Sequence, residues 1–474
     1  MADNFFRITK IICTLGPKTS SIEAIRKLVE NGMSVARLNF SHADHQFHKN
    51  TIENIKEIRN KLGHRYLSIG LDTKGPEIRL GNLSKSISVS KGDNLTLTND
   101  ETIIDESKNI LYFDLENLQS IKNNCEIMID DGILKLKVIE VNEKSVKTVA
   151  MNSHKISSKK GINIPGVHLT MPSLTKKDIA DIKFGLENEV DFIFASFINT
   201  EEDVIRIRKI FAEYSHKPLL FSKIETLNAI SNIDAIIEKS DGIMIARGDL
   251  GAEIGLEKLF FIQQMITEKC KLTNKPFIIA TQMLESMNIQ ALPTRAEVSD
   301  IGNSVLDGAD CIMLSSETAS GNFPFESVNI MSHISFETEK WLRKKSIENV
   351  EIPITNIYTA LTINKMSRVP NVRTVVIFTD DIKEVLDIKS AFLSIPIIVA
   401  SQDESMLRKI SILRGCLPYH VLFNLKTGDS DFKHRLVDEV IYVIKNMYFL
   451  EEKTNIIVYY RVSQNETVFK MIKV

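Results

Sequence analysis

The chain has 474 residues, of which 43% are apolar and 25% charged, so it is long enough for two to four domains with large buried cores. Lysine plus arginine (59) nearly balances aspartate plus glutamate (61), and the net charge of −2 argues against a nucleic-acid-binding protein. Five widely spaced cysteines without a CxxC pair favour a reducing, cytoplasmic compartment. The first ten residues lack the apolar segment of a secretory signal, and no apolar run reaches membrane-spanning length, so we expect no membrane partner.

Apolar strand-like runs alternate with amphipathic helical segments over most of the first 340 residues. Strands are predicted at 10–17, 34–40, 66–73, 190–197, 218–225, 242–249, 275–282 and 311–318. A strand–helix rhythm is typical of a parallel sheet. Eight such strands, in two segments whose combined length approaches the ~250 residues of a (β/α)8 TIM barrel, predict that α/β fold. A doubly wound open sheet is the alternative.

Two further domains are predicted around this barrel. Helical periodicity is largely lost between 75 and 170, where period-two alternation and a hairpin across Asp131-Gly132 indicate an inserted, β-barrel-like lid domain. The barrel then occupies 1–74 and 171–345. A C-terminal α/β domain is predicted over 346–474, with Glu351 and Pro353 marking the boundary. It would contain two strand–helix pairs, whose strands are VRTVVIFTDD and SIPIIVASQD, then a long helix at 433–449 and two last strands.

Charged and polar side chains stand where the predicted barrel strands end, which is where barrel active sites lie. Residues i and i+2 of a strand point to the same side, so Lys223 with Glu225, and Arg247 with Asp249, each bring a cation and a carboxylate to one face. Glu225 and Asp249 would suit a hard divalent cation such as Mg²⁺. The plainer interpretation is two surface ion pairs; polar groups at most of the other strand ends favour a site.

A second cation site is suggested by four oxygen-bearing residues after the second and third strands. They carry one formal negative charge in total, which suits a monovalent cation: Asn39, Ser41, Asp72 and Thr73. Ser41 has a competing interpretation as a helix cap, because Ser41-His-Ala-Asp44 resembles a capping box. In the insert, the basic loop Lys159-Lys160-Gly161 is either ordinary surface or part of a lid that meets phosphates.

Several segments together resemble the pyruvate kinase family: KIICTLGP, VARLNFSH, LDTKGPEIR, KKGINIPG, FASF, SKIE, SDGIMIARGDLG, ATQMLESM and PTRAEVSDIGNSVLDGADCIMLSSETASGNFP. The resemblance implies a barrel, a β lid inserted after the third strand, a C-terminal effector-binding domain and a homotetramer. It implies a glycolytic phosphotransferase that moves the phosphoryl group of phosphoenolpyruvate to ADP, giving ATP and pyruvate. Two alternatives are a degenerate paralogue with a structural or regulatory role, and another Mg²⁺-dependent barrel enzyme acting on phosphoenolpyruvate or pyruvate.

The resemblance also assigns roles at the substrate. Arg37 would bind the phosphoryl group, Lys223 would stabilise its charge during transfer, and Thr281 would contact the substrate near the carbon that is protonated. These three are the expected catalytic residues. The expected substrate-binding set adds neighbours of the substrate carboxylate, and reads Arg37, Lys223, Ala246, Arg247, Gly248, Asp249 and Thr281.

Cations and nucleotide are assigned in the same way. The resemblance implies that Glu225 and Asp249 ligate Mg²⁺ or Mn²⁺, and that K⁺ is held by Asn39, Ser41, Asp72 and Thr73. The nucleotide phosphates would meet Asn39, His42, Arg79 and Lys160. Family members that need K⁺ resemble this chain at Glu77, where K⁺-independent members carry Lys, although Leu80 departs from the Thr usual in the dependent group.

The C-terminal domain departs from the family pattern at its sugar-phosphate loops. The first loop here is FTDDIKE (378–384) and the second lies within YRVSQNETV (460–468), whereas the family uses a Thr/Ser-rich and a Gly-rich loop. Asp380 and Asp381 would repel a phosphate. We therefore expect that fructose bisphosphate does not activate the protein through this pocket.

Overall fold

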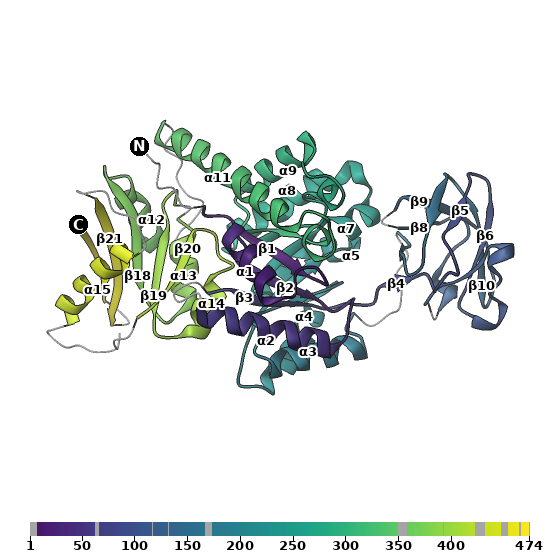
Figure 1. The fold of residues 1–474 in the computed structure, drawn as a ribbon, viewed down its shortest axis with the longest axis horizontal. Helices are drawn as coiled ribbons and strands as arrows, with labels where there is room; N and C mark the ends of the chain where they lie inside the picture. Colours follow the sequence, from purple (N-terminus) through teal and green to yellow (C-terminus); the bar gives the residue numbers. More distant parts are fainter. Residues whose placement is uncertain are drawn as a thin grey trace.

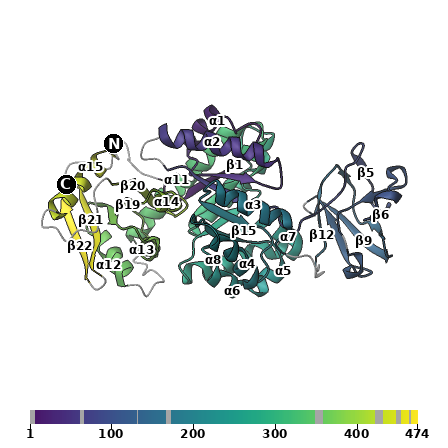
Figure 2. The same cartoon turned by 90° about the horizontal axis from the view of Figure 1, so that it is seen from below.

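The computed structural model describes residues 7–61, 66–115, 117–130, 132–165, 173–348, 358–391, 393–421, 432–446, 454–463 and 466–473. The molecule is elongated, with the barrel in the middle, the inserted β domain at one end and the C-terminal sheet at the other (Figures 1 and 2). Among the described helices, none is both long and apolar enough to cross a membrane.

Eight parallel strands close into a barrel in the order β1-β17-β16-β15-β14-β13-β3-β2, which confirms the predicted (β/α)8 fold over the open sheet. The strands are β1 (Lys10–Leu15), β2 (Val35–Asn39), β3 (Ser68–Asp72), β13 (Phe192–Ala195), β14 (Leu219–Ile224), β15 (Gly242–Ala246), β16 (Phe277–Ala280) and β17 (Cys311–Leu314). Aromatic rings fill part of the interior: a Cβ on Gly70 would collide with the ring of Phe194, and one on Gly242 with the ring of Phe221. Small residues therefore face large ones inside the barrel.

Helices surround the barrel (Figure 1). They are α1 (Ile22–Asn31), α2 (His45–Lys61), α3 (Lys176–Glu187), α4 (Glu201–Ala212), α5 (Leu227–Ser231), α6 (Ile233–Lys239), α7 (Arg247–Ile254), α8 (Leu256–Leu272), α9 (Arg295–Leu306), α10 (Ser316–Ala319) and α11 (Pro324–Glu348), with the 3-10 turn η4 (Glu285–Asn288). Helix α1 has a capped start and a glycine at its end: Ser21 accepts a hydrogen bond from the N–H of Ala24, and Gly32 at φ 122° follows the last turn.

Two local predictions are wrong. Strand β15 ends at Ala246, and Arg247 already begins α7, so Arg247 and Asp249 do not share a strand face. Residues two apart on a helix point in different directions, and these two side chains separate accordingly. Ser41 does not cap α2 either: the carboxylate of Asp44 accepts the N–H of Phe47 at 2.8 Å and takes that role.

The inserted segment forms a seven-stranded sheet, ordered β4-β12-β8-β9-β10-β6-β7, and the two-stranded ladder β11-β5. Its strands are β4 (Ile78–Arg79), β5 (Ile87–Val89), β6 (Asn94–Thr98), β7 (Ile110–Tyr112), β8 (Glu126–Ile129), β9 (Leu134–Val141), β10 (Ser145–Ala150), β11 (His154–Ile156) and β12 (Gly161–Asn163), with 3-10 turns η1 (Glu101–Ile103), η2 (Glu106–Lys108) and η3 (Leu118–Ser120). Strands β8 and β9 pair antiparallel, as the predicted hairpin requires. Asp131 of its turn and the predicted boundary at 170/171 lie outside the described residues.

The C-terminal segment contains a five-stranded sheet in the order β20-β19-β18-β21-β22. Its elements are α12 (Tyr358–Ser367), β18 (Val372–Phe378), α13 (Ile382–Lys389), β19 (Ile397–Ser401), α14 (Glu404–Ile410), β20 (Cys416–His420), α15 (Phe432–Asn446), β21 (Asn455–Ser463) and β22 (Glu466–Lys473). Helix α12 and strand β20 were not predicted from the sequence. Strand β20 contains Pro418, which cannot donate to a ladder and is tolerated because β20 lies at the edge of the sheet. Glu351, Pro353 and part of the 460–468 loop lie outside the described residues.

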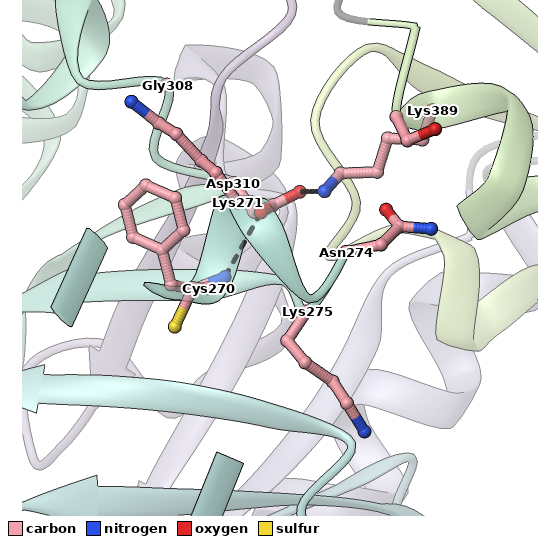
Figure 3. A pocket seen from close by; sticks show the side chains of 9 residues that line it. Cys270, Lys271, Asn274, Lys275, Gly308, Asp310 and Lys389 are labelled. Atoms are coloured by element: carbon pink, nitrogen blue, oxygen red, sulfur yellow. Dashed lines mark hydrogen bonds and ion pairs between the residues drawn. The ribbon is translucent and has the colours of Figure 1, made fainter. Parts of the chain in front are cut away.

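Buried carboxylates at the amino end of the barrel strands hold the C-terminal sheet to the barrel. Asp310 accepts hydrogen bonds from the N–H of Phe277 and of Arg414 and pairs with Lys389 of α13 at 2.8 Å. Figure 3 shows this ion pair beside Asn274, with Lys275 pointing away from it. Asp191 plays a similar part, because it accepts from Arg408 of α14 and from the N–H of Ile69.

Candidate active site

A cleft of about 800 Å³ lies between the carboxyl edge of the barrel and the inserted β domain. The barrel contributes His42, Phe197, Glu225 and Asp249 to its lining, and the insert contributes Glu77, Arg79, Asp130, Lys159, Lys160 and Asn163. Charged residues predicted from two distant parts of the sequence therefore face one space. The insert covers the edge of the barrel where such active sites form.

Lys223, near the end of β14, is the centre of the buried network beneath the cleft. Its ammonium lies 3.1 Å from Oδ1 of Asp72, 3.0 Å from Oε1 of Glu225 and 2.7 Å from Oγ of Ser196. Burial alone would lower the pKa of Lys223, but Asp72 and Glu225 outweigh it and raise the pKa, so the side chain is a permanent cation.

Arg37 on β2 supplies a second buried cation. Its Nε donates to Oδ2 of Asp72 at 2.7 Å, and Nη1 donates to Oγ1 of Thr14 on β1 at 2.7 Å. Burial favours the neutral form of Asp72, but Arg37 and Lys223 together lower the pKa of Asp72 below its usual range. Asp72 is thus an ionised carboxylate that orients both cations from the end of β3.

Glu225 and Asp249 are the two carboxylates predicted to hold a divalent cation. Glu225 is 2% exposed, and its Oε2 accepts the N–H of Phe197 at 2.6 Å. Burial, with the charge of Asp249, raises the pKa of Glu225 to about 7, although Lys223 acts in the opposite direction. Because the charge of Asp249 hinders ionisation of Glu225, a divalent cation beside both carboxylates would relieve that cost.

This pair is not a complete metal cage. Within the described residues, no group of three or more His, Cys, Asp or Glu side chains is arranged to hold a metal ion. A cation held by Glu225 and Asp249 would complete its shell with substrate oxygens and water, which is how Mg²⁺ is usually bound beside phosphates.

The turn after β15 and the turn after β16 contact each other. The N–H of Gly248 donates to Oγ1 of Thr281 at 2.8 Å, and that hydroxyl donates to the carbonyl of Ala280. Thr281 has φ 71°, an unusual conformation for a β-branched residue and one that concentrates at functional sites. The guanidinium of Arg247 bonds instead to the carbonyl of Thr281 and to Asp300, away from Asp249.

The four residues predicted to hold a monovalent cation lie together where β2 and β3 end. Asn39 and Asp72 are register partners, and the N–H of Phe40 donates to the carbonyl of Asp72. Oδ1 of Asn39 accepts the N–H of Ser41, and Oγ1 of Thr73 accepts the N–H of Ser196. The set offers neutral oxygens and one carboxylate, Asp72, which already contacts the two cations Arg37 and Lys223. Such a set fits a cation of low charge.

The insert brings its two predicted cations to the cleft, each paired with a carboxylate. Arg79 forms a two-pronged contact with Glu77 (2.9 and 2.6 Å) and donates to the carbonyl of Lys159 at 2.8 Å. Lys160 lies 2.7 Å from Asp130. Across the cleft, burial lowers the pKa of His42, which is neutral at pH 7. The insert thus presents paired cations toward the cleft, and the barrel presents a neutral imidazole opposite them.

Comparison with known proteins decides the family. Residues 6–328 match the family model described as "Pyruvate kinase, barrel domain". The chain belongs to the pyruvate kinase family. It is 40% identical over 426 residues to a pyruvate kinase of Trypanoplasma borreli, a match that covers 88% of this chain and 84% of the relative. It is 39% identical to that of Candida albicans (91% and 88% covered) and 40% identical to that of Bacillus licheniformis (86% and 71%).

Two residues that contact the site were not predicted from the sequence. The hydroxyl of Ser196 contacts the ammonium of Lys223. Phe197, whose backbone has φ 54°, donates its N–H to the carboxylate of Glu225. Both directly follow β13, the fourth barrel strand, so the same strand-end signal that indicated Lys223 and Glu225 was present there. Neither is charged, which is why the pattern of charges did not indicate them.

Proposed function

We propose that this chain is an active pyruvate kinase, which transfers the phosphoryl group of phosphoenolpyruvate to ADP and releases ATP and pyruvate. The observation that carries the proposal is the placement of Lys223. Its buried ammonium lies between Asp72 and Glu225 at the carboxyl edge of a barrel that a basic lid covers. Phosphoryl transfer depends mainly on positioning and on stabilising charge, and a desolvated, oriented cation serves both.

The positions of the substrate residues support the roles proposed for them. Arg37 and Lys223 would bind the phosphoryl oxygens, because Asp72 orients both cations. Ala246, Arg247, Gly248 and Asp249 belong to the turn from β15 into α7, where backbone N–H groups can receive the substrate carboxylate. Thr281, whose hydroxyl contacts that turn, would lie beside the carbon that is protonated after transfer.

Glu225 and Asp249 would hold Mg²⁺ or Mn²⁺, which when bound neutralises charge on substrate and phosphate oxygens. Asn39, Ser41, Asp72 and Thr73 would hold K⁺, and Asn39, His42, Arg79 and Lys160 would meet the phosphates of the nucleotide. Support for the K⁺ requirement comes from Glu77, which stands where K⁺-independent members of the family carry Lys. Glu77 is partly buried, and burial raises its pKa although Arg79, Lys74 and Lys223 act in the opposite direction.

The proposal includes a cytoplasmic homotetramer that binds neither nucleic acid nor membrane, built from a barrel (1–74 and 171–345), a lid (75–170) and a C-terminal domain (346–474). Self-association is supported by large apolar side chains exposed on one side of the barrel, at α8 and the segment before α9. These are Leu256 (77% exposed), Phe260 (67%), Ile289 (78%) and Leu292 (68%). Surfaces of this kind usually mark a protein interface.

One assay tests the activity and separates the alternatives. Purified protein is given phosphoenolpyruvate, ADP, Mg²⁺ and K⁺, and pyruvate is measured while each component is omitted in turn. We expect turnover that requires ADP and a divalent cation and falls strongly when tetramethylammonium replaces K⁺. Turnover without ADP would indicate a different phosphoenolpyruvate enzyme, and substrate binding without turnover would indicate a degenerate paralogue. Equal rates in tetramethylammonium would refute the K⁺ requirement.

A further inference from the structure

Ser196 makes the shortest contact to the ammonium of Lys223. Its Oγ lies 2.7 Å from Nζ, compared with 3.0 Å for Glu225 and 3.1 Å for Asp72. Ser196 is 3% exposed and directly follows β13. The hydroxyl is therefore inside the network that surrounds Lys223.

Two hydrogen bonds to Thr73 hold Ser196 in place. Its N–H donates to Oγ1 of Thr73 at 3.0 Å, and its hydroxyl donates to the carbonyl of Thr73 at 2.6 Å. Oδ1 of Asp72 is a second possible acceptor for this hydroxyl, but at 3.3 Å it is much farther away. With its only proton directed to Thr73, Oγ of Ser196 can act toward Lys223 only as an acceptor.

An ammonium group has three N–H donors, and here each has one acceptor, from Asp72, Glu225 and Ser196. In the proposed function, Glu225 belongs to the metal site and its contact with Lys223 is the one that must be given up. Asp72 and Ser196 would then hold two donors and aim the third toward the cleft. Ser196 orients the ammonium and leaves its charge intact. A third carboxylate in its place would orient the ammonium but also neutralise its charge.

We propose that Ser196 is a positioning residue for phosphoryl transfer, which directs the ammonium of Lys223 toward the phosphoryl group. The proposal rests on the proposed function and on the assigned role of Lys223. Loss of this hydroxyl lets the ammonium move toward the carboxylates, and misplacement of a reacting group by about 1 Å can cost a factor of ~10² in rate.

The test compares Ser196→Ala with Ser222→Ala in steady-state assays with phosphoenolpyruvate, ADP, Mg²⁺ and K⁺. Ser222 is a matched control because it is equally buried, precedes Lys223 on β14, and bonds to Ser240 rather than to the site. We expect kcat of Ser196→Ala to fall ~10- to 100-fold with KM for phosphoenolpyruvate changed less than threefold. Ser222→Ala should keep the kcat of the unmodified protein.

The double variant Lys223→Ala/Ser196→Ala separates positioning from a general structural role. If Ser196 acts through Lys223, its removal changes nothing once the ammonium is absent, so the double variant should match Lys223→Ala. A further drop of tenfold or more would overturn the proposal. So would a kcat of Ser196→Ala within threefold of the unmodified protein, and that result would leave the proposed function intact.

Ser196→Cys keeps the test decisive if the alanine variant unfolds. A thiol has nearly the shape of the hydroxyl but is a weak acceptor. We expect its thermal unfolding temperature to stay close to that of the unmodified protein and its kcat to lie clearly below it. Full activity in the cysteine variant would contradict a role for the hydroxyl as an acceptor.

Discussion

Replacing Lys223 by alanine removes a cation that contacts both Asp72 and Glu225. The ammonium lies 3.1 Å from Asp72 and 3.0 Å from Glu225, and these carboxylates are only 1% and 2% exposed. The substitution therefore has two separate consequences. The transferring phosphoryl group loses a charge partner, and two buried carboxylates lose the cation between them.

The expected loss of kcat is ~10³- to 10⁵-fold, the range measured when a cation that stabilises a transferring phosphoryl group is removed. At 1.36 kcal/mol for each factor of ten, this corresponds to ~4–7 kcal/mol of transition-state stabilisation. Removing one partner of a buried ion pair costs ~3–5 kcal/mol of folding stability. Protonation of Glu225, whose pKa is already raised to about 7, offsets part of that cost. We therefore expect the thermal transition to fall by only several degrees.

Pyruvate formation and thermal unfolding are measured on Lys223→Ala and on Lys61→Ala. Lys61 is a suitable control because its side chain is 65% exposed and forms an ion pair with Glu57 on the same helix. The control should match the unmodified protein in both measurements. A rate for Lys223→Ala within threefold of the unmodified protein would refute the assignment of Lys223. An unchanged unfolding temperature for Lys223→Ala would show that folding stability does not depend on the ion pairs between Lys223 and the buried carboxylates.

Three further predictions concern the metal, pH and regulation. Mg²⁺ at 100 times its dissociation constant should stabilise the unmodified protein against unfolding by ~2.7 kcal/mol, and should stabilise Glu225→Gln much less. Thermal unfolding in Mg²⁺ and in EDTA measures this difference. Equal shifts of the unfolding temperature in the two proteins would contradict the metal site. Burial lowers the pKa of Lys10 to about 8 from 10.5, so the unfolded chain binds more protons between these pH values and stability should rise across that window by up to ~3 kcal/mol. Denaturant unfolding of Lys10→Met should lack this rise, and an unchanged slope would exclude Lys10 as its source. Fructose bisphosphate should leave the phosphoenolpyruvate saturation curve unchanged, because the hydroxyl of Thr379 (2.5 Å) and the guanidinium of Arg461 (2.6 Å) already contact the carboxylate of Glu384. A sigmoidal-to-hyperbolic shift that disappears when loop 378–384 is mutated would contradict this.

The barrel could be predicted because its signal is local. Each strand is a short apolar run between turn residues and a helix, and both faces of the strands are buried, as in β1, where all six residues are buried. The end of β15 could not be placed in the same way. Its last strand residue, Ala246, is followed directly by a helix that has no side-chain cap, so no polar cap residue marks the change from strand to helix.

The members of the candidate site were predictable, but their contacts were not. Lys223 and Glu225 are two residues apart, and their proximity follows from strand geometry. Asp72, which holds Lys223, lies on β3, and the sequence between them includes the whole insert. These strand ends come together because β3 and β14 both pair with β13, on opposite sides of it. Ser196 was missed for a related reason: a neutral hydroxyl has no distinctive pattern until the atom it contacts is known.

The balance of charge in the resting site supports the assignment of the two carboxylates to a metal. Arg37 and Lys223 face three carboxylates, Asp72, Glu225 and Asp249, so negative charge is in excess. Burial and, to a lesser extent, the charge of Asp249 raise the pKa of Glu225, while Arg37 and Lys223 lower the pKa of Asp72. A site with this balance repels an anionic substrate until a divalent cation joins it, and then attracts one. Phosphoenolpyruvate should therefore bind tightly only in the presence of the divalent cation. Calorimetric titration without ADP can measure this, and equal affinity in EDTA would refute the argument.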